Sequence, residues 1–428
     1  MDKIVIRGGR RLSGEVRASG AKNAALPLLF SSLLTGEQCR YDNVPELADI
    51  RTTVRLLQSL GAEVLESSNH RVAVRTQELR SIEAPYQLVK TMRASFLTLG
   101  PLLARVGRAR VSTPGGCAIG ARPVNLHLAG FERMGAKIEI VHGYVQAEAP
   151  RDRSGGTRLV GARIELDTPS VGATENLMMA ATLARGTSLI ENAAREPEIE
   201  DLARALVKMG ARIDGAGSRV VVVDGVDVLR GVDHEVIADR IEAGSLLAAA
   251  AMTGGECRVR GARAAHLEAF LVKLEEAGAD VARDPEGVTV RSRGRLRAVA
   301  VKTAPFPGFA TDLQAQMMAA LTIAEGSGVI TETVFENRFQ HALEMIRLGA
   351  DISIEGHTAI VRGVARLSGA PVMATDLRAS MSLILAGLAA ENTTEILRVY
   401  HLDRGYERVE EKLRALGADI SRETGASA

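Results

Sequence analysis

Apolar and polar positions follow a pattern that returns six times along the chain. Each repeat holds an almost uncharged helical stretch and then an amphipathic one with apolar residues three or four positions apart. A Gly-Ala pair follows, and after it two short alternating runs flank a turn, as expected for a β-hairpin. The Gly residues of these pairs are Gly61, Gly135, Gly210, Gly278, Gly349 and Gly417. The pattern predicts six β-α-β-α-β-β repeats.

The uncharged stretches decide the expected architecture. They carry almost no charge on any face, so we expect them to be buried all round. They lie at residues 24–37, 95–107, 176–186, 244–255, 313–326 and 380–392. The amphipathic helices should keep one face in water. The sequence therefore predicts an α/β fold with these buried helices inside and the sheets outside, three repeats to a domain.

The two ends of the chain complete each other. The last repeat lacks a second hairpin strand after Ile420, and the chain begins with a lone strand, Ile4–Arg7. The segment RGGRRLSG that begins at Arg7 closely matches RGVARLSG at Arg362. We infer that the N-terminal strand completes the last repeat.

The pairing of the two chain ends defines the expected domains. One domain would contain residues 22–237 with the first three repeats, and the other would contain residues 1–21 and 238–428 with the last three. Two crossings, near residues 21 and 237, would form a hinge. The segment 227–238 contains no uncharged helix and is interpreted as a linker.

Composition argues against several functions. The chain has 53 Lys and Arg against 52 Asp and Glu, without the basic excess of a general nucleic-acid binder. Aromatic residues are only 3% and Trp is absent, which argues against base stacking. The longest apolar runs are about ten residues, whereas about 20 cross a bilayer. With no apolar signal core at the start and only three Cys, we predict a cytoplasmic protein without a membrane span.

Polar residues collect at the N-termini of the uncharged helices. They are Lys22 and Asn23, Arg93, Ser170 and Thr174, Asp239 and Arg240, Asp312, and Asp376 and Arg378. The Asp residues can be N-caps. A Lys or Arg opposes the helix dipole by about 0.3–1 kcal/mol, and four repeats carry one. This indicates a site for a multiply charged anion, most simply phosphate; the alternative is that each Arg only pairs with a nearby carboxylate.

A second candidate is the Gly- and Pro-rich segment Ser112–Pro123, which predicts a mobile loop. It contains Cys117, with Arg122 nearby. A thiol with a pKa near ~8.5 is mainly protonated at pH 7 and suits a general acid, while a neighbouring cation would favour the nucleophilic thiolate. The alternative is an incidental surface Cys. Cys39 and Cys257, at matching strand positions of two repeats, are interpreted as packing residues.

Other candidates are weaker. Arg338 and Arg404 stand ahead of the amphipathic helix of their repeats, as Arg122 does. The histidines His127, His341 and His401 show no metal-ligand spacing and are interpreted as structural. Because the chain has no phosphate-loop, CxxC or HExxH motif, we predict neither a metal nor a cofactor.

Five segments closely resemble the enolpyruvyl transferase family, and within it the UDP-N-acetylglucosamine 1-carboxyvinyltransferases. They are GAKNAA at 20–25, the Cys loop at 114–124, ENAAREPE at 191–198, TETVFENRF at 331–339 and DRGYER at 403–408. The similarity covers essentially the whole chain, and the motifs follow the family's order. It implies the two-domain inside-out α/β barrel, with three similar repeats per domain, which agrees with the repeat pattern.

The resemblance also implies a reaction. Enolpyruvate would pass from phosphoenolpyruvate to the 3-hydroxyl of UDP-N-acetylglucosamine by addition and elimination, releasing phosphate. This is the first committed step of peptidoglycan precursor synthesis. The partners would be these two small molecules, with no nucleic acid and no membrane; no oligomeric state is predicted.

Residue roles follow from the same resemblance. Cys117 would be the acid that protonates the enol carbon, would form a phospholactoyl adduct and would be the thiol that fosfomycin alkylates. Asp312 would be the base for the sugar hydroxyl, and Lys22 and Arg404 would also take part in catalysis. Phosphoenolpyruvate would be held by Lys22, Asn23, Arg122, Arg378 and Arg404. The nucleotide-sugar site would be lined by Arg93, Arg122, Pro123, Val124, Asn125, Leu126, Ser170, Val171, Gly172, Asp312 and Val334. Since the acid and the base belong to different domains, catalysis should need domain closure, with the Cys loop as a lid.

Two positions depart from the family's usual residues, and the interpretation has two alternative functions beside it. Thr168 stands where close relatives often have Lys, and Asn125 where they often have Asp, which could reshape contacts to the nucleotide. The first alternative is the sister enzyme 5-enolpyruvylshikimate-3-phosphate synthase, which typically has Gly-Ser-Lys-Ser in place of Gly-Ala-Lys-Asn and lacks the Cys loop. The second is a non-catalytic nucleotide-sugar-binding paralogue. The joint presence of Lys22, Cys117, Asp312 and Arg404 argues against it.

Overall fold

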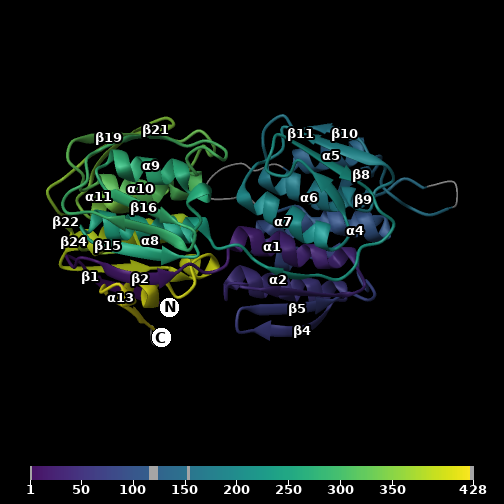
Figure 1. Cartoon of the computed structure of the whole chain (residues 1–428), viewed down its shortest axis with the longest axis horizontal. Helices are drawn as coiled ribbons and strands as arrows, with labels where there is room; N and C mark the ends of the chain where they lie inside the picture. The colour runs from purple at the N-terminus through teal and green to yellow at the C-terminus, as the bar shows by residue number, and fades with distance from the viewer. Residues whose placement is uncertain (1, 115–123, 152–154, 425–428) are drawn as a thin grey trace. The chain divides into compact units, whose positions relative to one another are not determined.

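The computed structural model describes residues 2–114, 124–151 and 155–424 (Figure 1). Among these, residues 20–237 form one compact unit, here the continuous unit. Residues 2–19 and 238–424 form another, here the split unit. Within the described ranges, no helix is long and apolar enough to cross a membrane.

Every repeat builds one four-stranded sheet with the same pairing. The first two strands are parallel, and the remaining pairs are antiparallel. In the continuous unit the sheets are β14–β3–β5–β4 (Asp233–Glu235, Gln38–Asp42, Arg71–Arg75, Glu63–Ser68), β6–β7–β9–β8 (Glu83–Ala84, Arg108–Ser112, Tyr144–Glu148, Lys137–Val141) and β10–β11–β13–β12 (Arg163–Glu165, Thr187–Glu191, Val220–Asp224, Arg212–Asp214). The last two strands of each sheet are the predicted hairpins.

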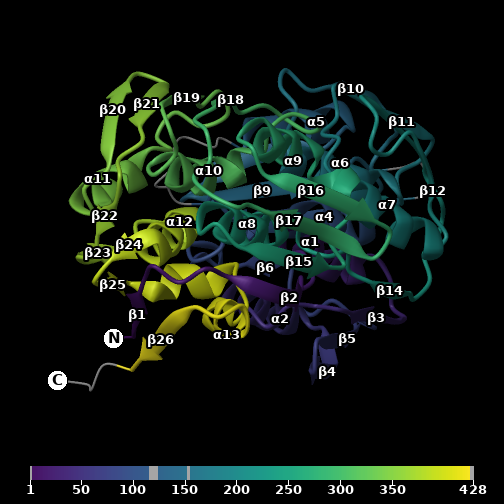
Figure 2. The same ribbon diagram turned by 60° about the vertical axis from the view of Figure 1, so that its left-hand side comes forward.

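The split unit repeats this plan. Its sheets are β2–β15–β17–β16 (Ser13–Arg17, Glu256–Arg260, Gly287–Arg291, Asp280–Asp284), β18–β19–β21–β20 (Ala300–Lys302, Ser327–Thr331, Thr358–Arg362, Asp351–Glu355) and β23–β25–β1–β26 (Pro371–Met373, Thr393–Leu397, Lys3–Arg7, Asp419–Glu423). A two-stranded pair, β22–β24 (Leu367–Ser368, Ala390–Glu391), is added. The purple β1 lies between the yellow β25 and β26, so it supplies the strand that the last hairpin lacks (Figure 2).

The strands next to the two crossings pair within their own unit, although the chain passes into the other unit directly after each of them. β2 precedes the first helix of the continuous unit, yet it pairs in parallel with β15 of the split unit's first sheet. β14 precedes the first helix of the split unit, yet it pairs in parallel with β3. The interpretation of 227–238 as a linker was therefore wrong for residues 233–235, which form an edge strand of the first sheet.

Three inner helices fill the centre of each unit. They are α1 (Lys22–Ser31), η2 with α4 (Arg93–Thr98, Leu99–Val106) and α6 (Val171–Ala181) in the continuous unit, and α8 (Arg240–Met252), η4 with α10 (Thr311–Leu313, Gln314–Leu321) and α12 (Leu377–Ala389) in the split unit. All residues from Ala24 to Leu34, and all from Ile241 to Met252, are buried. This confirms the predicted burial on every face, and each buried Leu contributes about 1.5–3 kcal/mol.

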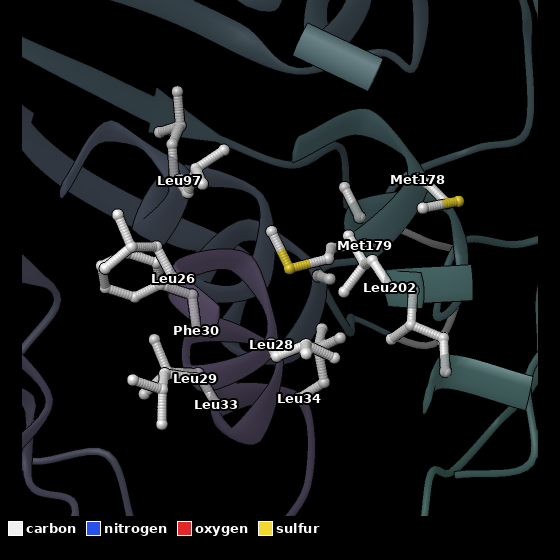
Figure 3. Packing of buried hydrophobic residues seen from close by; sticks show 14 of the residues in the cluster. Leu26, Leu28, Leu29, Phe30, Leu33, Leu34, Leu97, Met178, Met179 and Leu202 are labelled. Carbon is white, nitrogen blue, oxygen red and sulfur yellow. The ribbon is translucent and has the colours of Figure 1, made fainter. Parts of the chain in front are cut away.

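Figure 3 shows this core around α1, with Leu26 and Phe30 on one side of the helix and Leu28 on the other. Met179 of α6 and Leu202 of the neighbouring outer helix α7 are buried with them. The outer helices are α2 (Ala48–Leu60), α5 (Asn125–Arg133), α7 (Pro197–Lys208), α9 (Glu268–Glu276), α11 (Gln340–Arg347) and α13 (Val409–Ala415). Short helices complete the chain: η1 (Ser32–Leu34), α3 (Tyr86–Val89), η3 (Ala264–His266) and η5 (Val399–Arg404).

The repeated Gly-Ala pair has a local cause. Each outer helix ends with its Gly at positive φ, between 87° and 110°, which disfavours any side chain. The amide of the following Ala donates to the carbonyl five residues earlier, the hydrogen bond of a Schellman motif. The donors are Ala62, Ala136, Ala211, Ala279, Ala350 and Ala418. The pair is therefore the stop signal of each outer helix.

Three arginines cap the ends of inner helices in alternate repeats. Their guanidinium groups donate to carbonyl oxygens where one inner helix ends and where a hairpin strand ends beside it. Arg105 binds Leu33, Thr35, Thr76 and Gln77; Arg158 binds Leu183, Ala184 and Val226; Arg295 binds Ile323, Ala324 and Val364. Cations suit these positions because the carbonyl end of a helix carries partial negative charge.

Candidate functional site

The described candidate residues divide between the two units. The continuous unit holds Lys22, Asn23, Arg93, Val124, Asn125, Leu126, Ser170, Val171 and Gly172, and the split unit holds Asp312, Val334, Arg378 and Arg404. Cys117, Arg122 and Pro123 lie outside the described residues.

Lys22 and Asn23 are the first two residues of α1, which no side chain caps. The Lys22 ammonium lies 3.6 Å from the Asp49 carboxylate in the first turn of α2, and both side chains are largely buried. A cation therefore stands at the start of this inner helix, as predicted, although it also has the carboxylate partner of the alternative interpretation.

Arg93, the first residue of η2, lies beside His127 of α5. Burial, together with the charge of Arg93, lowers the pKa of His127 to about 3, so this imidazole is neutral. Its Nδ1 accepts a hydrogen bond from the Asn176 amide at 3.1 Å. A Cβ on Gly172 would approach the His127 ring to 3.4 Å, so the ring lies against the start of α6.

Other predicted residues of this unit begin helices. Ser170 is the N-cap of α6, and its hydroxyl accepts a hydrogen bond from the Ala173 amide. Asn125 begins α5, and Leu126 is half-buried against the core. The structure thus brings Arg93 and Gly172 together around His127, which the sequence had assigned a purely structural role.

In the split unit, Asp312 is held by two buried arginines. Arg338 Nη2 donates to Oδ1 at 2.6 Å, and Arg378 Nη2 donates to Oδ2 at 2.7 Å. Burial alone would raise the pKa of this carboxyl, but the charges of Arg378 and Arg338 hold it well below its usual range. Asp312 is therefore an ionised acceptor.

One guanidinium nitrogen of Arg378 is available to bind a ligand. It is the second residue of α12, its side chain is about 5% exposed, and its guanidinium lies 5.4 Å from the ring centre of Tyr406. In the part of the chain that the structure describes, its Nη1 has no hydrogen-bond partner. A buried donor of this kind is expected to meet an acceptor, and an anion oxygen is the strongest one.

Arg404 ends η5, which packs on α12. It lies near His401, whose pKa is lowered by burial and by the charge of Arg404. The nearby Tyr406 hydroxyl contacts Ser245 at 2.9 Å and accepts from Gln316 at 2.8 Å, which connects the segment after η5 to α8 and α10. The structure thus brings Asp312 and Arg378 together and places Arg404 on an element that contacts α12.

The structure confirms the N-cap alternative for two Asp residues and the packing interpretation of two Cys residues. Asp239 caps α8 by accepting from the amides of Ile241 and Glu242, and Asp376 caps α12 by accepting from those of Arg378 and Ala379. Cys39 and Cys257 are fully buried, and burial raises their pKa values to about 11 and about 12. Both thiols are therefore packing residues.

Comparisons with known proteins agree over the full length. The family described as EPSP synthase (3-phosphoshikimate 1-carboxyvinyltransferase) matches residues 6–413. A protein of Geobacter metallireducens named UDP-N-acetylglucosamine 1-carboxyvinyltransferase is 56% identical over 99% of both chains, and one of Geotalea daltonii with the same name is 55% identical over the same share.

The chain belongs to the UDP-N-acetylglucosamine 1-carboxyvinyltransferase family. This confirms the resemblance of the sequence motifs. The enolpyruvyl transferase NikO of Streptomyces tendae is 26% identical with a TM-score of 0.87, covering 99% of both chains. An EPSP synthase of Acinetobacter baumannii, at 18% identity and a TM-score of 0.76 over 99% and 100% of the two chains, shares the fold. The predicted fold class is thus that of the enolpyruvyl transferases. Among the described residues, no cluster of His, Cys, Asp and Glu has the arrangement of a metal site.

Proposed function

We propose that this transferase moves enolpyruvate from phosphoenolpyruvate to the 3-hydroxyl of UDP-N-acetylglucosamine and releases phosphate, the first committed step of peptidoglycan precursor synthesis. The observation that carries the proposal is the Asp312–Arg378 pair, which combines an ionised acceptor with a buried cation that has an unpartnered donor. The first can accept the proton of a hydroxyl group, and the second can bind an anion oxygen. The proposed reaction supplies both.

The reactants are two polyanions, so their mutual repulsion must be offset. Lys22 and Asn23 at the start of α1, with Arg122, Arg378 and Arg404, bind phosphoenolpyruvate in this proposal. Arg93, residues 122–126, residues 170–172, Asp312 and Val334 bind the nucleotide sugar. The N-terminus of α6, capped by Ser170, favours negative charge through its backbone amides.

In the addition step, the sugar hydroxyl oxygen bonds to C2 of phosphoenolpyruvate. Its proton passes to Asp312, and the Cys117 thiol gives its proton to C3. In the elimination step, the C2–O bond to phosphate breaks and C3 returns a proton to the Cys117 thiolate, which restores the double bond and leaves phosphate as the product. The thiolate can instead attack C2 and form the phospholactoyl adduct.

The low pKa of Asp312 makes it a weak base while both arginines hold it. A substrate carboxylate on Arg378 Nη1 adds negative charge beside Asp312, and this raises the pKa of the carboxyl. The base is therefore strongest when phosphoenolpyruvate is bound. Two of the three thiols are buried and unpaired, which fits the reducing cytoplasm in which we place the reaction.

A phosphate-release assay tests the proposal. Phosphate should appear only when both substrates are present, and each substrate is omitted in turn as the control. Shikimate 3-phosphate in place of the nucleotide sugar should give none; release with this acceptor would favour the sister synthase. Nucleotide-sugar binding without phosphate release would favour a non-catalytic paralogue.

A further inference from the structure

One buried carboxylate beside the Asp312 site, that of Glu332, has no role in the reaction as proposed so far. Glu332 follows β19 and is 1% exposed. Its two oxygens accept from different parts of the split unit. The Oε1 atom accepts from the Val334 amide at 2.8 Å and from the Phe335 amide at 3.2 Å. It also accepts from the Thr303 hydroxyl at 2.8 Å.

These bonds to Oε1 fix the turn that carries Val334. Thr303 adds a second tie, because its hydroxyl accepts from the Thr333 amide at 2.9 Å. That hydroxyl must therefore use its own hydrogen for Glu332. The three donors converge on one oxygen, and the turn 332–335 is closed by the side chain of its first residue.

The Oε2 atom is connected to the other candidate residue, Asp312. Among the described residues its one donor is the Thr311 hydroxyl, at 2.8 Å, and Thr311 directly precedes Asp312. The Thr311 oxygen in turn accepts from Arg338 Nη1 at 2.9 Å, while Nη2 of the same guanidinium donates to Asp312. Since an arginine can only donate, the direction of every bond is determined: Arg338 donates to Thr311, and Thr311 donates to Glu332.

We propose that Glu332 is a positioning residue that sets Asp312, through Thr311 and Arg338, and the Val334 turn in one fixed arrangement. This inference rests on the proposed function. A role limited to anchoring the turn would use Oε1 alone, whereas Oε2 is directed at Thr311, which is not part of the turn. The hydrogen bonds that Oε1 accepts from the turn and from Thr303 (the turn arm) and the hydrogen bond that Oε2 accepts from Thr311 (the Thr311 arm) can therefore be removed separately.

The Thr311 arm is tested by Glu332→Gln and by Thr311→Val. The Gln carbonyl oxygen can keep the three donors of the turn, but its NH2 group faces the Thr311 oxygen and reverses that bond. Thr311→Val removes the hydroxyl while keeping the shape. Both variants should lose about 10- to 100-fold in kcat, the effect of a misplaced base, with KM for UDP-N-acetylglucosamine within about threefold of wild type. Thr311→Ser, which keeps the hydroxyl, should restore kcat.

The matched control is Thr303→Val, which weakens only the turn arm. It should raise KM for the nucleotide sugar more than it lowers kcat. Melting temperatures show whether each variant is folded. If Glu332→Gln does not fold, the comparison of Thr311→Val with Thr311→Ser still tests the positioning role. Wild-type kcat in Thr311→Val, or a loss in Thr311→Ser as large as in Thr311→Val, overturns the positioning role. An inactive wild-type enzyme would instead overturn the proposed function.

Discussion

Two histidines with lowered pKa values stay uncharged far below neutral pH. Burial lowers the pKa of His127 to about 3 and that of His341, in the first turn of α11, to about 4. Asp376 opposes this shift at His341, and Arg338 adds to it. An imidazole with a lowered pKa binds fewer protons in the folded chain than in the unfolded chain, so acid favours unfolding.

This gives a pH prediction for His341. The unfolded chain takes up its proton below about pH 6.5 and the folded chain only below about 4, so stability is fully present above 6.5 and falls between these values. His341→Gln should remove about 1.4 kcal/mol per pH unit from this slope. Urea unfolding at several pH values measures it, with His70→Gln in an exposed turn as the control. Equal slopes for wild type and His341→Gln would contradict the assignment.

The three thiols should differ sharply in reactivity. Cys39 and Cys257 are buried with raised pKa values, so we expect fosfomycin to label Cys117 alone, which peptide mass spectrometry detects. Cys117→Ser should abolish phosphate release, whereas Cys117→Asp should retain some, because a carboxylic acid can also donate the proton. Labelling at Cys39, or full activity in the Ser variant, would refute this sorting of the thiols.

Residue roles were only partly predictable from the sequence. Asp239, Asp312 and Asp376 all stand at the start of an inner helix, and nothing local separates them. The first and third are N-caps, while Asp312 is held by Arg338, 26 positions later, and Arg378, 66 positions later. Residue type and helix position indicated the candidates, but the contacts that distinguish them depend on the folded chain.

At the scale of elements, the helix ends are specified locally. The Gly-Ala pair was visible in the sequence because a Schellman motif needs Gly at one position of a short segment. The edge strand β14 was not visible, since three residues, Asp233–Glu235, carry no alternating pattern and their partner β3 lies about 190 positions earlier. Signals within one repeat could thus be found, and pairing between distant segments could not.

The arginine caps predict a stability effect at this scale. Arg105→Ala should lower the free energy of unfolding by about 1–3 kcal/mol, since it leaves carbonyl groups at the end of an inner helix without their donor. Arg51→Ala, on the exposed side of α2, should change it by less than about 0.5 kcal/mol. Chemical denaturation compares them, and equal losses would show that Arg105 does not act as a cap.

For the whole molecule, the proposed reaction needs Cys117 and Asp312, which the sequence assigns to different domains. We therefore expect UDP-N-acetylglucosamine to reduce the radius of gyration in small-angle scattering, because closure excludes water from the reacting groups. Shikimate 3-phosphate, which should not bind, is the matched control. An unchanged radius at saturating nucleotide sugar would count against closure.

The place of β1 has a consequence for biosynthesis. The continuous unit contains all its own strands between residues 20 and 237, so it can fold while the ribosome is still making the remainder. β1 is made before the other strands described here, yet both of its neighbours, β25 and β26, are made after all the others. An unpaired strand is exposed to wrong partners throughout this interval. The nascent chain thus carries β1 as an open strand until residues 393–423 have been made, and a chaperone that covered this strand would protect it during that time.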